Sequence, residues 1–171
     1  MTQHSPAPTG PPGLIVDPPV PGGERAAKTC TLVLAHGAGQ GMESPFMESM
    51  ARLVAAHGIE VVRFEFPYMA RMRREGRRRP PDPAARLLAA WSEVLDTLAG
   101  SAETPRRLLI GGKSLGGRIA SLLAADRPVA GLVCLGYPFH PPGKPQRTRI
   151  AHLESLAVPT LICQGERDPF G

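Results

Sequence analysis

The chain has 171 residues, of which 42% are hydrophobic, and a formal net charge of +5. This length and composition fit one globular domain with a sizeable core, and no apolar run approaches the ~18 residues of a membrane span. Between Arg71 and Arg79, six arginines and one glutamate account for the whole net charge. We therefore expect a solvated arginine-rich loop there, and no nucleic-acid partner.

Residues 1–26 are rich in proline and glycine and show little apolar periodicity. This composition predicts a disordered leader, in which only Leu14 to Val16 could form a short edge strand. No secretory signal pattern is present, so a cytoplasmic location is the expectation. The three cysteines lie in apolar runs without metal-ligand spacing, which predicts buried thiols and no metal site.

Residues 27–171 form the predicted domain, and short hydrophobic runs alternate in it with helical patterns. The runs predict strands at 29–35, 59–66, 107–112, 130–137 and 159–165. Near-continuous hydrophobic strands are buried on both faces, as in a parallel sheet covered by helices. We therefore predict a doubly wound, mostly parallel α/β sheet with helices on both faces, and place strand 107–112 between 29–35 and 130–137.

Helix signals separate these strands. Ser44-Pro45 and Asp82-Pro83 offer N-terminal caps with a first-turn proline, while Gly58 and Gly100 can end the two helices. A third helix is predicted from Ser114 to about residue 125, and a short fourth at about 148–156. The expected core-facing stripes are Phe46, Met50, Leu53 and Val54 in the first helix, and Leu87, Trp91, Leu95 and Leu98 in the second.

The stretch LLIGGKSLGG, residues 108–117, contains both GKS and the pattern G-x-S-x-G. A phosphate-binding loop needs a glycine at position 107, which is Arg107, and a loop long enough to wrap phosphates. The strand instead continues to within two residues of Lys113. Gly112 to Gly116 therefore predicts a nucleophile elbow, in which Ser114 sits at a sharp turn from strand to helix.

An acyl-transfer site also needs N–H donors that stabilise the developing oxyanion. The N–H of Leu115, directly after the serine, can be one donor. The glycine-rich loop HGAGQG that follows strand 29–35 can supply the second, for which we choose Ala38, with Gly37 and Gly39 as alternatives.

The acidic partner is expected after a later strand. The run PTLICQGERDPFG places Asp168 at the carboxyl end of strand 159–165, with Glu166 as the alternative. No cofactor is needed for this chemistry.

The motifs LAHGAGQGMESPFM, VVRFEFPYMA, GGKSLGGR, CLGYPFHPPGKP and GERDPFG, in this order, resemble the α/β-hydrolase superfamily. They are most similar to its dienelactone-hydrolase-like branch, related to the hydrolase-like domains of testis-expressed protein thirty and of subunit three of the nonspecific-lethal complex. The resemblance covers about Lys28 to Gly171. It implies a serine hydrolase of esters or related acyl compounds, without a large lid domain.

The sequence departs from the family pattern at its end. The chain stops three residues after Asp168, so the last helix, the last strand and the histidine that the family places after them are expected to be missing, as in a truncated chain. His36 lies beside the oxyanion loop and is better placed to orient it than to act as a base; His140 lies in the proline-rich rim. Two functions stay open: an acyl hydrolase of small-molecule substrates, and an inactive hydrolase-like module that binds an acidic partner through Arg71–Arg79.

Overall fold

The computed structural model describes residues 13–20, 30–100 and 107–171. They form a six-stranded sheet in the order β1-β3-β2-β4-β5-β6. Its strands are β1 (Leu14–Asp17), β2 (Cys30–Ala35), β3 (Glu60–Phe64), β4 (Arg107–Lys113), β5 (Gly131–Leu135) and β6 (Thr160–Cys163). The leader prediction for residues 1–12 and 21–26 lies outside the described residues.

The strand pairing confirms the predicted architecture. β4 lies at the centre, parallel to β2 on one side and to β5 on the other. β3 and β6 extend the parallel arrangement, and β1 is the one antiparallel strand in the described sheet, at its edge beside β3. The carboxyl ends of β2, β4, β5 and β6 therefore meet at one edge of the sheet, where an open α/β sheet places its site.

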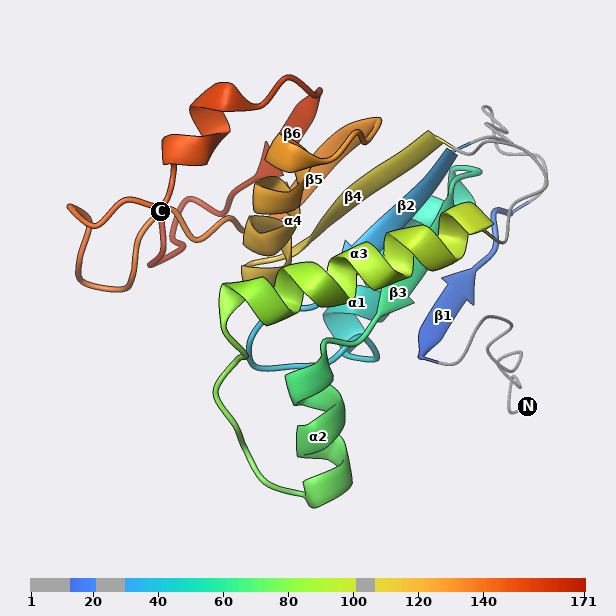
Figure 1. Cartoon of the computed structure of the whole chain (residues 1–171), viewed down its shortest axis with the longest axis horizontal. Coiled ribbons are helices and arrows are strands. Elements are labelled where there is room, and N and C mark those ends of the chain that lie inside the picture. Colours follow the sequence, from blue (N-terminus) through green and yellow to red (C-terminus); the bar gives the residue numbers. More distant parts are fainter. Residues whose placement is uncertain (1–12, 21–29, 101–106) are drawn as a thin grey trace.

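Helices cover both faces of this sheet (Figure 1). Helices α3 (Ala84–Gly100) and α4 (Leu115–Asp126) pack on one face, with Trp91 and Ile119 fully buried among the side chains of β2, β3 and β4. Helix α1 (Pro45–Ala56) packs on the opposite face, where Met47 and Ala51 contact a smaller cluster with Leu34. The predicted fourth helix is a short 3-10 helix, η1 (Ala151–Ser155).

The predicted core-facing stripe of α1 was wrong in part. Val54 packs against the smaller core cluster as predicted, but Phe46 and Leu53 are 40% and 60% exposed. The buried residues of α1 are Met47, Ala51 and Ala55. The start of the helix is as expected, because the Ser44 hydroxyl accepts a hydrogen bond from the Met47 N–H and Pro45 opens the first turn. The buried face thus combines one large side chain, Met47, with two alanines, while Phe46 and Leu53 lie on the exposed side.

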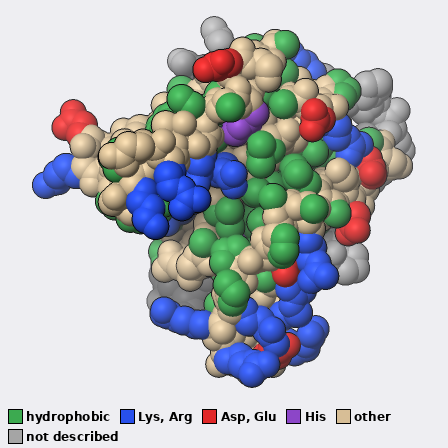
Figure 2. All heavy atoms as spheres, turned by 60° about the vertical axis from the view of Figure 1, so that its left-hand side comes forward, with side chains coloured by type: hydrophobic (Ala, Val, Ile, Leu, Met, Phe, Trp, Pro, Cys, Tyr) green, Lys and Arg blue, Asp and Glu red, His purple; other side chains and the backbone are tan. Residues whose placement is uncertain are grey.

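The prediction of a loop from Arg71 to Arg79 was also wrong in part, because Arg71 to Glu75 belong to helix α2 (Pro67–Glu75). Proline at the first position starts this helix, and Gly76, with φ of +68°, ends it. Lys and Arg side chains gather at this end of the molecule, in the lower part of Figure 2. Four of the six arginines form ion pairs, which are Arg71–Asp82, Arg73–Glu65, Arg77–Glu75 and Arg79–Glu75.

A buried ion pair fixes the edge strand β1. The Arg63 guanidinium, with a side chain only 6% exposed, donates to both carboxylate oxygens of Asp17 at 2.8 and 3.0 Å, and to the Met42 carbonyl at 2.8 Å. A bidentate pair of this type combines geometric specificity with charge neutralisation. It ties β1 to β3 and to the loop that precedes α1.

The prediction of three buried thiols is correct only for Cys134; Cys30 is half-buried and Cys163 is exposed. Cys163 lies in β6, which pairs with β5 alone among the described strands and is largely exposed. Within the described segments, no helix is long and apolar enough to cross a membrane.

Candidate active site

Ser114 occupies the turn between the central strand β4, which ends at Lys113, and helix α4, which begins at Leu115. Its φ of 50° is positive, and no other residue except glycine in the described part of the chain has a positive φ. The Ser114 N–H donates to the Leu135 carbonyl at the end of β5, at 3.0 Å. Such a strained turn persists only where the surrounding structure holds it, and it points to a functional site.

The strand also rules out the phosphate-loop interpretation. Residues up to Lys113 pair with β2 or β5, so no loop precedes the lysine that could wrap phosphates. The Lys113 ammonium lies over the ring of Phe46, 5.1 Å from its centroid.

Glycines make the close approach at this turn possible. A Cβ atom on Gly112 or on Gly116 would lie 2.3 Å from the Ala35 carbonyl oxygen, and one on Gly111 would lie 2.0 Å from the Val133 carbonyl oxygen. These distances are shorter than any van der Waals contact, so the backbones of β2, β4, β5 and α4 meet here without side chains between them. Neighbouring backbone therefore fixes the position of Ser114.

The loop after β2 lies directly beside Ser114. A Cβ atom on Gly37 would lie 3.8 Å from the Cβ of Ser114 and 3.5 Å from the Lys113 carbonyl oxygen. The fully buried His36 holds this loop: its Nε2 accepts from the Phe66 N–H at 3.0 Å, and its Nδ1, which carries the proton, donates to the Gly37 carbonyl at 2.7 Å. Burial lowers the pKa of His36, which keeps the ring neutral.

A second buried group, the Tyr68 hydroxyl, also holds the loop at Gly37 and Ala38. The buried Tyr68 hydroxyl of α2 donates to the carbonyls of Gly37 and Ala38, at 3.1 and 3.3 Å. Burial raises the pKa of Tyr68, and the nearby charges of Asp82 and Glu65 raise it further, so the hydroxyl stays a donor.

The orientation of the Gly37–Ala38 peptide follows from these two contacts. In a trans peptide the C=O and N–H groups point in opposite directions, and the described chain contains no cis peptide. Because the Gly37 carbonyl faces His36 and Tyr68, the Ala38 N–H faces away from both. No backbone partner of the Ala38 N–H is found among the described residues. The Leu115 N–H, in the first turn of α4, is likewise one of the groups that a helix leaves without an intrahelical partner.

Asp168 lies in the loop after β6, on the other side of Ser114. Its Oδ1 accepts from the Phe170 N–H at 3.0 Å, and its Oδ2 would lie 3.4 Å from a Cβ on Gly136. Gly136 directly follows Leu135, the residue whose carbonyl binds the Ser114 N–H. Asp168 and Ser114 thus flank the end of β5. The alternative acid, Glu166, is exposed in the same loop.

No histidine in the described part of the chain forms a hydrogen bond with Ser114 or Asp168. Both ring nitrogens of His36 are engaged elsewhere, and Nδ1 of His140 lies 3.0 Å from the Pro141 carbonyl. Nε2 of His152 lies 2.7 Å from the hydroxyl of the buried Ser121 in helix α4. His4 is outside the described residues.

Sequence reasoning missed Tyr68 because it missed helix α2. The signal was present, since Pro67 at a first helical position and Gly76 as a C-cap bracket a nine-residue helix. The six arginines between positions 71 and 79 were interpreted as a solvated loop, although arginine is a good helix former.

One comparison decides to which protein family the chain belongs. A family described as "Alpha/beta hydrolase domain" matches residues 28–171. The chain belongs to this alpha/beta hydrolase family. The predicted α/β fold class is therefore confirmed by the comparison as well as by the sheet order.

Solved structures agree with this alpha/beta hydrolase fold. A homologue of alpha-beta serine hydrolases from Coxiella burnetii matches with 22% identity and a TM-score of 0.68, over 99% of this chain and 78% of that one. A dienelactone hydrolase from Anabaena variabilis matches with 22% identity and a TM-score of 0.69, over 91% and 68% of the two chains. A serine hydrolase without lid from Xanthomonas campestris matches with 18% identity and a TM-score of 0.62, over 88% and 76%.

At these identities the similarity establishes the fold of this alpha/beta hydrolase. The relation to testis-expressed protein thirty and to the nonspecific-lethal subunit stays a prediction. Within the described segments, no cluster of three or more His, Cys, Asp or Glu could hold a metal ion.

Proposed function

We propose that this chain hydrolyses carboxylic esters or related acyl compounds, with Ser114 as the nucleophile. The observation that carries the proposal is the positive φ of Ser114 at the junction of the central strand and α4, beside the Gly37 loop. A serine in this position presents its hydroxyl at the carboxyl edge of the sheet, where the loops leave room for a substrate.

The proposed reaction has two steps. The Ser114 oxygen bonds to the ester carbonyl carbon, its proton passes to a base, and the carbonyl oxygen takes up negative charge that the Leu115 and Ala38 N–H groups would stabilise. The carbonyl re-forms, and the C–O bond to the alcohol breaks as the alcohol accepts the proton. Water then repeats the attack on the acyl-serine and releases the acid and free Ser114.

Asp168 has the role of orienting the basic histidine in this proposal. Its half-buried carboxylate lies beside Gly136 and keeps Oδ2 free of protein hydrogen bonds among the described residues. His36 cannot be that base, because its Nε2 is occupied by the Phe66 N–H and its pKa is lowered by burial. The base is assigned to a histidine other than the four that the structure describes.

The alternative of an inactive module that binds acidic partners is not favoured. Its basis was a free cluster of arginines, and ion pairs to Glu65, Glu75 and Asp82 neutralise much of that charge. The proposed partner is therefore a small-molecule acyl substrate.

A fluorophosphonate probe, which reacts with activated serines, tests the assignment. With imidazole added as an external base, we expect labelling of the wild-type chain to disappear in Ser114→Ala and to persist in Ser155→Ala, a control at an exposed serine of η1. Added imidazole, as an external base, should increase the hydrolysis of p-nitrophenyl acetate by the wild type but not by Ser114→Ala. Equal labelling of Ser114→Ala and the wild type would refute the nucleophile.

A further inference from the structure

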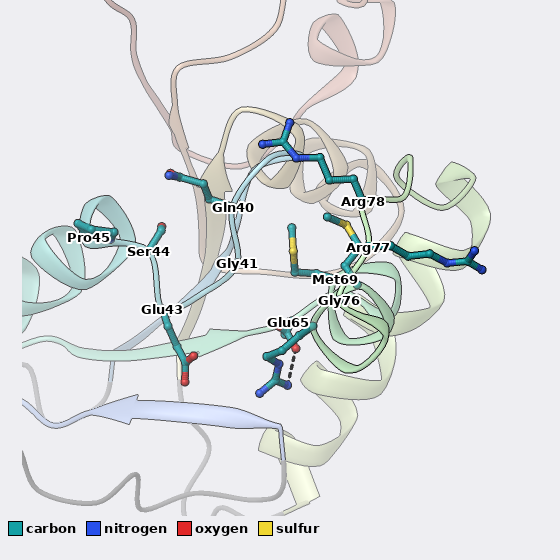
Figure 3. A pocket seen from close by; sticks show the side chains of 12 residues that line it. Gln40, Gly41, Glu43, Ser44, Pro45, Glu65, Met69, Gly76, Arg77 and Arg78 are labelled. Carbon is teal, nitrogen blue, oxygen red and sulfur yellow. Dashed lines mark hydrogen bonds and ion pairs between the residues drawn. The ribbon is translucent and has the colours of Figure 1, made fainter.

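A pocket of about 470 Å³ lies between the loop after β2 and helix α2 (Figure 3). One wall is the loop that carries the proposed oxyanion donor, from Gln40 to Pro45. The opposite wall is α2 with the segment that follows it, and Glu65, just after β3, lies at its base. Neither the nucleophile nor the acid of the proposed mechanism lines this pocket, so the proposed reaction has not yet used it.

The pocket is within reach of a substrate bound at Ser114. Gly37 adjoins Ser114, and Gly41, four residues further along the same loop, contacts the pocket floor, since its Cβ would lie 3.4 Å from Cγ of Met69. Four residues span at most about 14 Å when fully extended. An extended acyl chain of about twelve carbons, with its carbonyl at Ser114, is long enough to cover that span and to extend over the loop into the pocket.

Part of the pocket lining is apolar. Met69 and Met72, on successive turns of α2, contribute it, and Met69 is only 7% exposed. Methionine adapts its shape to flexible apolar groups. An aliphatic chain fits this lining better than a sugar or another strongly hydrated group, which would need many polar partners.

The two ends of the pocket differ in charge. At one end Arg73 is neutralised by Glu65 at 2.7 Å, and Glu43 points away from the interior (Figure 3). At the other end Arg78 extends toward Gln40, whereas Arg77 points outward and pairs with Glu75. Arg78 has no ion-pair partner in the described part of the chain. It is therefore the cation that is available to a ligand.

We propose that this pocket binds the acyl chain of an ester whose far end is a carboxylate, with the methylene groups over Met69 and Met72 and the carboxylate on Arg78. The inference rests on the proposed function, because it places the ester carbonyl at Ser114. The unpaired guanidinium selects a negative charge, and the methionines select an aliphatic spacer between that charge and the ester. Gln40 can donate a further hydrogen bond to the carboxylate.

Two matched substrates test the specificity. p-Nitrophenyl dodecanoate and the mono-p-nitrophenyl ester of dodecanedioic acid share a twelve-carbon acyl chain and differ in the terminal carboxylate. With imidazole added as the external base, we expect Arg78→Gln to lower kcat/KM for the dodecanedioate ester roughly fivefold at low salt and to leave the dodecanoate ester unchanged. The control is Arg74→Gln, since Arg74 is also exposed and without an ion pair among the described residues but does not line the pocket.

Binding without turnover separates this inference from the proposed function. In Ser114→Ala, calorimetry with monomethyl dodecanedioate should show binding that Arg78→Gln weakens roughly fivefold and Arg74→Gln does not. If this holds while no ester is hydrolysed, the pocket assignment stands and the proposed reaction fails. If esters are hydrolysed but Arg78→Gln affects both esters equally or neither, the reaction stands and the pocket assignment is overturned.

Discussion

The Nε2 atom of His36 accepts a hydrogen bond from the backbone N–H of Phe66 at 3.0 Å. A protonated ring could not accept this bond, and burial adds to the cost of the charge. The loop beside Ser114 is therefore held by a histidine that must remain neutral.

This histidine makes stability depend on pH. The pKa of His36 is lowered from 6.5 in the folded state by burial, so the unfolded chain takes up the proton first as the pH falls. The contribution of His36 is fully present above about pH 6.5 and decreases below it. We expect urea midpoints to fall between pH 7 and pH 5, with a smaller fall in His36→Asn, which can keep the Phe66 hydrogen bond without titrating. Identical pH slopes for both proteins would contradict this role.

Gly116→Ala should destabilise the fold strongly. Its new Cβ would lie 2.3 Å from the Ala35 carbonyl oxygen, and backbone on both sides leaves no flexible group to move. Overpacking of this kind costs about 1–3 kcal/mol or more. Gly39→Ala is the matched control, because no atom lies within 4 Å of that Cβ. Thermal unfolding should show a large loss for the first variant and almost none for the second; equal losses would disprove the packing argument.

Ser114→Gly should make the protein more stable while removing the proposed nucleophile. A φ of 50° is costly for serine and free for glycine, so relief of this strain should raise the free energy of unfolding by about 1 kcal/mol. Ser114→Ala keeps the strain and should show no such gain. Chemical denaturation of the two variants provides the comparison, and a less stable glycine variant would mean that the turn is not strained.

Asp17→Asn should cost about 3–5 kcal/mol, because it leaves the buried Arg63 guanidinium without a counter-charge. The control is Glu48→Gln, which breaks the exposed pair between Glu48 and Arg52 within α1 and should cost less than about 1 kcal/mol. Urea unfolding measures both. Similar small losses would show that the Arg63 pair is solvated in solution.

The fold could be predicted from sequence because its strands are nearly continuous hydrophobic runs, and the elbow because glycines surround Ser114 at a strand end. The predictions that were wrong concern which side chains are buried by neighbouring elements. Phe46 and Leu53 share the apolar pattern of α1 with Val54, but the face that meets the sheet is the one with Met47, Ala51 and Ala55, and only the tertiary packing selects it. Cys163 lies in a hydrophobic strand, yet β6 is at the edge of the described sheet and stays exposed. Neither the buried face of α1 nor the exposure of Cys163 can be predicted from the hydrophobic pattern of the segment itself.

The pocket could not have been predicted for a related reason. Its lining comes from the loop after β2 and from α2, segments about 25 residues apart that meet only after β3 has formed. The arginines of α2 and of the segment after it are distinguished by their partners alone: Glu65 neutralises Arg73, while Arg78 has no ion-pair partner among the described residues.

Main-chain atoms hold the proposed nucleophile in place, since the carbonyls of Ala35, Val133 and Leu135 enclose the turn at Ser114. The pocket is lined instead by side chains of the loop after β2, of α2 and of the segment after it, none of which belongs to this turn. Under the proposed function, substitutions at Met69, Met72 or Arg78 would alter what is bound without displacing the Ser114 oxygen. Selection or a mutant library would then vary the substrate in this region while the proposed chemical step stays the same.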